Sequence, residues 1–195
     1  MSIQKIFELV AKKYHVEDLF TMLENNSMPV SFLMINNDNK IQGEQLVDDH
    51  LMKDATQRPL NGIQAYYLDG KVPERLSRNP IFALRENHLQ RSDELTELLV
   101  VHELAHAIEK QGLENQLLVT LSDCDVIIGR EIEKIANEVY DQTVGFGKDI
   151  DHNCKFGAIL SSLIRRQFPQ AHPKKLSDAL QYNLLDDYSS RFVCE

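Results

Sequence analysis

Two histidines four residues apart, with a glutamate directly after the first, are the residues best placed to do chemistry. The run from His102 to His106 reads HELAH, an HExxH pattern. Residues four apart share one face of a helix, so both imidazoles can bind one tetrahedral zinc ion. Glu103 lies about 100° further around such a helix, where its carboxylate can take a proton from metal-bound water. The pattern predicts a zinc metallopeptidase site, in which zinc activates water and polarises the peptide carbonyl.

The sequence around this motif predicts a helix over residues 93–111. Ser92 is suited to the N-cap, and Lys110 followed by Gly112 indicates the end of the helix. The apolar residues 98–101 lead directly into the motif, which is typical of a buried helix.

A catalytic zinc ion also needs a third protein ligand and an open position for water. One candidate is His152, in a turn-forming stretch just before an apolar helix that starts at Phe156. The other is Glu133, on a predicted helix where the small Ala136 allows a close approach to the motif helix. Imidazole and carboxylate are both good zinc ligands, so both candidates stay open.

Two segments together resemble the SprT-like (Spartan-like) zinc peptidases. They are residues 99–108, which contain HExxH, and residues 152–156, which read HNCKF. The signature of that family is HExxH followed by a histidine in an HGxxF loop, so the resemblance implies His152 as the third ligand. Asn153 stands where the signature has glycine, and the long stretch after His106 implies an inserted helix. SprT-like proteins act on proteins near or crosslinked to DNA, which implies a protein substrate.

A second resemblance points to the other candidate ligand. Residues 133–137, EKIAN, are similar to the ExxAN-type helix of the ImmA/IrrE-like gluzincin peptidases. In that family a carboxylate follows HExxH, so the resemblance implies Glu133, with no inserted helix. The family acts on repressor proteins.

Two further residues are candidates for supporting roles. Glu109 lies on the same helix face as His102 and His106, where its carboxylate can hydrogen-bond the residues around the metal. Tyr140 can stabilise the oxyanion if its helix flanks the site.

The order of predicted elements favours an α+β fold with one domain over residues 1–195. We expect a helical segment over 1–25 with a break near His15, then mainly strands and loops over 26–90, the active-site helix over 93–111, and a mainly helical part over 113–195. Strands are predicted at 30–35, 63–68 and 81–84, and later helices from 114 into the early 140s, at 156–168 and at 173–185. The HExxH motif and the resemblances imply that this domain is zincin-like, with a small mixed sheet.

The strand at 81–85 has a further predicted role. It lies just before the motif helix, so we expect it to be the sheet edge where an extended substrate docks by main-chain pairing.

Composition limits the other functional classes. A net charge of −9 argues against direct nucleic-acid binding, because that affinity comes from clustered Lys and Arg. No apolar run is long enough to span a membrane, and the first residues lack a secretory pattern. The three cysteines form no CxxC pair and are expected to be reduced. These features favour a cytoplasmic protein with a protein or peptide substrate and one zinc ion.

An alternative function is a non-catalytic binding module, in which zinc only stabilises the fold. If Glu133 and His152 both bound the metal, four protein ligands would close the site and leave no position for water.

Overall fold

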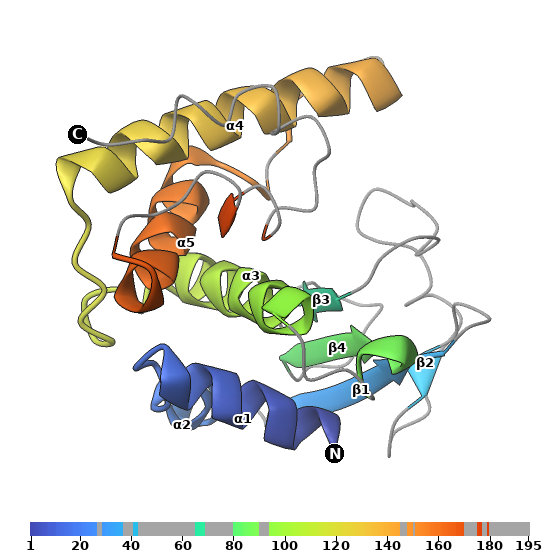
Figure 1. Ribbon diagram of the computed structural model, residues 1–195. Helices are drawn as coiled ribbons and strands as arrows, with labels where there is room; N and C mark the ends of the chain where they lie inside the picture. Colours follow the sequence, from blue (N-terminus) through green and yellow to red (C-terminus); the bar gives the residue numbers. More distant parts are fainter. Residues whose placement is uncertain are drawn as a thin grey trace. The chain divides into compact units, whose positions relative to one another are not determined.

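The computed structural model describes residues 1–26, 29–36, 41–42, 65–68, 80–89, 94–144, 148–149, 151–169, 175–176 and 179. It has the predicted α+β composition (Figure 1). Contacts divide the chain into two compact units, residues 1–107 and 108–195, and the boundary falls inside helix α3 (Glu94–Gln111). The single domain therefore stays a prediction, and the two units are described separately.

Two helices open the first unit, α1 (Ile3–Lys13) and α2 (Leu19–Asn26). Ser2 caps α1, its side chain accepting a hydrogen bond from the backbone N–H of Lys5. The helix ends because His15 adopts a left-handed conformation with φ of 57°, and the N–H of Val16 bonds back to the carbonyl of Ala11 at 2.9 Å. The predicted break near His15 is confirmed.

The sheet of the first unit has four described strands, in the order β2-β1-β4-β3. The strands are β1 (Ser31–Ile35), β2 (Ile41–Gln42), β3 (Ala65–Leu68) and β4 (Ile81–Arg85). Strand β1 runs parallel to β4, and the other two pairs are antiparallel, so the predicted mixed sheet is confirmed. Strand β2 was not predicted, because two residues carry no periodicity.

Strand β4 is not a sheet edge, and the predicted substrate-docking role for residues 81–85 is wrong. It pairs with β1 on one side and with β3 on the other, so its backbone groups already have partners within the sheet. All five of its side chains are buried. An edge strand must instead leave one row of N–H and C=O groups unpaired.

An aromatic cluster fixes α1 against the sheet. The Phe82 ring on β4 lies 5.0 Å from that of Phe7 on α1, 5.9 Å from that of Phe32 on β1 and 4.8 Å from that of Tyr67 on β3. Buried aromatic pairs at such distances contribute packing and orientation together. The sheet lies between α1 and α3 (Figure 1).

The end of α1 also holds the start of α3. The Tyr14 hydroxyl and the Lys13 ammonium both donate to the Glu97 carboxylate at 2.7 Å. Burial, together with the hydrogen bond and charge of Glu97, raises the pKa of Tyr14. The hydroxyl stays protonated and keeps donating, which orients the helix that carries HExxH.

Two long helices dominate the described part of the second unit, α4 (Asp123–Val144) and α5 (Cys154–Gln167). The predicted start at residue 114 is wrong, because the chain turns at Leu118, where φ is 52°. A capping box then begins α4: Ser122 N–H donates to the Asp125 carboxylate at 2.8 Å, and Asp125 N–H donates to Ser122 Oγ at 3.2 Å.

Several predictions lie on residues whose structure is not described. Ser92 and most of the expected helix at 173–185 are among them, although residues 175, 176 and 179 are helical. Cys194 also lies outside the described residues. Cys124 is disulfide-bonded and Cys154 is free, so the expectation of reduced thiols is wrong for Cys124. Among the described helices, none combines the length and apolar character needed to cross a membrane.

Helices α4 and α5 approach each other closely at two glycines. A Cβ atom on Gly129 would collide with the carbonyl oxygen of Cys154 and would lie 2.8 Å from the backbone nitrogen of Ala158. A Cβ atom on Gly157 would lie 2.8 Å from the Cα of Gly129. Because these neighbours are backbone atoms, they cannot move aside without separating the helices.

We therefore expect Gly129→Ala to destabilise the protein by about 1–3 kcal/mol through overpacking. Alanine normally stabilises a helix interior relative to glycine by about 1 kcal/mol, so a loss of stability would identify the close contact as its cause. Urea unfolding of this variant, beside Arg130→Ala at an exposed α4 position, measures the effect. A Gly129→Ala variant as stable as wild type would contradict this account.

Candidate metal centre

Helix α3 places His102 and His106 one turn apart on the same face. Their Nε2 atoms lie 3.0 Å apart and their ring centroids 4.7 Å apart. The helix ends as predicted at Gly112, where φ is 65° and the N–H of Leu113 bonds to the carbonyl of Ile108 at 3.0 Å. Both imidazoles can therefore present ligand atoms to one ion.

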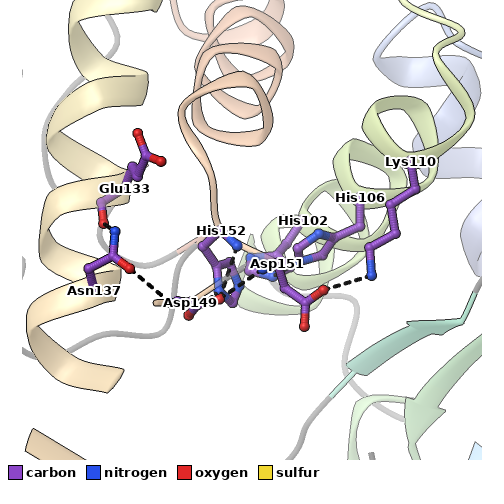
Figure 2. Close-up of polar contacts among 8 residues, drawn as sticks. All are labelled: His102, His106, Lys110, Glu133, Asn137, Asp149, Asp151 and His152. Atoms are coloured by element: carbon purple, nitrogen blue, oxygen red, sulfur yellow. Dashed lines mark hydrogen bonds and ion pairs between the residues drawn. The ribbon is translucent and has the colours of Figure 1, made fainter. Parts of the chain in front are cut away.

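The loop that carries His152 is held by α4. The Oδ1 of Asn137 accepts a hydrogen bond from the backbone N–H of Asp149 at 2.8 Å. The Nδ2 of the same amide donates to the backbone carbonyl of Glu133 at 2.9 Å, which sets the orientation of the amide (Figure 2). Helix α4 thus fixes the position where the loop begins to turn.

The Asp149 carboxylate organises the rest of the loop. Its Oδ1 accepts from the backbone N–H groups of Asp151 at 2.9 Å and His152 at 3.2 Å, and its Oδ2 lies 2.9 Å from Nδ1 of His152. Burial alone would raise the pKa of Asp149, but the hydrogen bond and charge of His152 and the two backbone N–H groups outweigh it and lower that pKa. An ionised carboxylate only accepts, so the contact favours a hydrogen on Nδ1 of His152, and in the neutral tautomer of that kind the lone pair is on Nε2.

The loop also contacts the last turn of α3, within the unit of residues 108–195. Lys110 Nζ lies 2.8 Å from the Asp151 carboxylate, and the Nδ2 of Asn153 donates to Glu109 at 3.1 Å. Asn153 caps α5, its side chain accepting from the N–H of Phe156 at 2.9 Å. Asparagine thus has a role where the SprT-like signature has glycine.

Just beyond the loop, Lys155 Nζ lies 2.7 Å from the Glu114 carboxylate. Burial by itself would raise the pKa of Glu114, but the hydrogen bonds and the charge of Lys155 outweigh it and lower that pKa. This ion pair adds a contact between the start of α5 and the turn after α3.

Three histidines lie close enough together to bind a metal ion. One ligand atom from each of His102, His106 and His152 lies within 4.8 Å of the other two. Among the residues that the structure describes, they form the single group of this kind. The long segment between His106 and His152 contains α4, the additional helix that the His152 alternative requires.

Glu133, the other candidate ligand, is not part of this group. Its carboxylate points away from the loop that holds His152, while its backbone carbonyl binds Asn137 (Figure 2). The ExxAN-like segment therefore contributes the amide of Asn137 to the support of the loop.

The three donors fit a small transition-metal ion. Nitrogen atoms about 2.0–2.1 Å from a tetrahedral ion stand about 3.3 Å apart. The 3.0 Å between the two α3 histidines and the 4.8 Å limit for the group bracket that spacing. Three imidazoles leave a fourth position for water, and imidazole suits zinc, copper, iron and nickel.

The other predicted site residues are placed less fully. Glu103 is buried on α3, and Glu109 contacts the residue that follows His152. Tyr140 lies half-buried on α4, and its role stays a prediction. Sequence reasoning missed Asn137 and Asp149, although an aspartate three residues before His152 is a recognisable signal for an Asx turn.

Comparisons with models of protein families, with curated proteins and with solved structures give no match. The resemblances to SprT-like and ImmA/IrrE-like peptidases therefore stay predictions that rest on the motifs.

The placement of the histidines predicts different results for the two candidate third ligands. We expect His152→Ala to lose bound metal and Glu133→Ala to retain it, because the Glu133 side chain lies outside the histidine group. Elemental analysis after overnight dialysis measures the difference, and chelator treatment of wild type gives the metal-free baseline. Loss of metal from Glu133→Ala alone would contradict this assignment.

Proposed function

We propose that this protein is a zinc-dependent metallopeptidase that hydrolyses peptide bonds in a protein substrate. The single observation that carries the proposal is the group of three histidines, two of them flanking Glu103 in an HExxH helix. His102, His106 and His152 would hold the ion. Three neutral nitrogen ligands and an open fourth position are typical of catalytic rather than structural zinc.

Zinc would supply an acidified water and a polarised substrate carbonyl at neutral pH. The Glu103 carboxylate would act as general base toward water and would later deliver the proton to the leaving amine. Glu103 is buried on α3, directly after His102 in the sequence. The bond that breaks is the peptide C–N bond, and water supplies the oxygen and hydrogens of the two products.

The finer identity is part of this proposal and rests on resemblance. We propose a zincin-like fold and a SprT-like peptidase, with His152 in the place of the loop histidine of the signature. The net charge of −9 favours a substrate recognised as protein over one recognised through nucleic-acid phosphates. A cytoplasmic location stays a prediction.

The non-catalytic binding module would be favoured by a metal closed by four protein ligands. Glu133 was the expected fourth ligand, and within the described part of the chain it does not join the three histidines. The open position is what a hydrolase requires.

We expect Glu103→Gln to bind zinc like wild type and to cleave at least about 100-fold more slowly, since a general base contributes about 10²–10⁴-fold. Cleavage is measured on a proteome-derived peptide library by mass spectrometry, with Glu94→Gln at an exposed position of the same helix as the matched control. Equal cleavage by wild type and Glu103→Gln would refute the mechanism, and zinc binding without cleavage by wild type would favour the binding module.

A further inference from the structure

In the described loop around His152, hydrogen bonds hold both the backbone and the imidazole ring. Asp149 uses both carboxylate oxygens, on two backbone N–H groups and on the imidazole, and its own N–H is held by Asn137. We propose that Asp149 and Asn137 are positioning residues of the metal centre: Asp149 selects the tautomer of His152 that binds metal, and Asn137 holds Asp149 in place. This inference rests on the proposed metal site.

The tautomer matters because only an unprotonated ring nitrogen can bind a metal ion. In water, neutral imidazole exchanges its hydrogen between Nδ1 and Nε2. A carboxylate 2.9 Å from Nδ1 keeps the hydrogen there, so the lone pair of the neutral ring is on Nε2. Partners of this kind also fix the ring plane, and their loss typically weakens metal affinity about 10–100-fold.

Burial decides which acidic residue of the loop has this effect. The Asp149 and His152 side chains are 12% and 17% exposed, so water screens their hydrogen bond weakly. Asp151 is 52% exposed and its partner Lys110 is 29% exposed, and ion pairs so open to solvent contribute little. Asp149, rather than Asp151, is therefore the residue on which the metal site depends.

Asn137 links Asp149 to α4, because both the oxygen and the nitrogen of its side-chain amide form hydrogen bonds. One end accepts from the N–H of Asp149, and the other donates to the carbonyl of Glu133 in the preceding turn of α4. A rotated amide would place a donor against the N–H of Asp149, so the second bond secures the first. The orientation of α4 is in this way transmitted to the third ligand.

The decisive variant is Asp149→Asn. Its side-chain oxygen can still accept from the backbone N–H groups of the turn, whereas its NH₂ group would face Nδ1 of His152 and favour the hydrogen on Nε2. The matched control is Asp151→Asn, the same chemical change two residues along the chain, which removes a charge and leaves the tautomer alone. Asn137→Ala tests the second positioning residue from outside the loop.

Two measurements separate positioning from general damage. Competition with a chromophoric chelator gives the affinity for Zn²⁺, and two-bond ¹H–¹⁵N spectra of the metal-free protein give the tautomer of His152. We expect Asp149→Asn to bind Zn²⁺ about 10–100-fold more weakly, with the hydrogen moved to Nε2. We expect Asn137→Ala to be weakened in the same direction and Asp151→Asn to match wild type.

An Asp149→Asn variant with wild-type affinity and tautomer would overturn the inference, as would equal losses in Asp149→Asn and Asp151→Asn, which would indicate a charge effect. If Asp149→Asn does not fold, the tautomer and affinity of Asn137→Ala decide, and wild-type values there overturn the inference. A wild-type protein that binds no Zn²⁺ would instead refute the proposed function.

Discussion

The candidate metal centre depends on holding a loop histidine close to two histidines on a helix. The helix pair needs little help, because the geometry of α3 itself brings Nε2 of His102 and His106 to 3.0 Å. A loop has no such internal constraint, and ordering each of its residues costs about 1–2 kcal/mol of backbone entropy. The hydrogen bonds of Asp149 offset that cost by fixing both the turn and the imidazole.

Two residues that precede this loop in the sequence support its two ends. Asn137 on α4 holds the beginning, and Glu109 on the last turn of α3 holds Asn153 just after the ligand. Because Asn153 also caps α5, the ligand lies directly before a rigid helix. Gly129 and Gly157 let α4, which carries Asn137, pack closely against α5.

In this arrangement, both segments that resemble peptidase motifs have a structural role in the same site. From sequence, the HNCKF and EKIAN segments compete to supply one ligand. In space, HNCKF supplies the imidazole and EKIAN supplies the amide that anchors the preceding aspartate. A segment that resembles a ligand motif can therefore support the loop that carries a candidate ligand. Here it does so through the backbone carbonyl of Glu133 and the side chain of Asn137.

The sequence alone determined the features that depend on neighbours along the chain. The HExxH pair, the break at His15 and the end of α3 at Gly112 each follow from local geometry, and the structure agrees with all three. It also indicated the α+β composition, because apolar periodicity distinguishes helices from strands. The predicted start of α4 at residue 114 was too early, because Leu118, a residue with positive φ, interrupts a pattern that favours a helix.

Only the tertiary structure decided the features that depend on residues distant in sequence. The place of β4 in the middle of the sheet depends on which strands pair with it, and an apolar run such as 81–84 fits that buried position better than an edge. The choice of His152 over Glu133 depends on where α4 directs its side chains relative to the loop. The sequence offered both candidates with suitable chemistry, and only the tertiary structure groups His152 with His102 and His106.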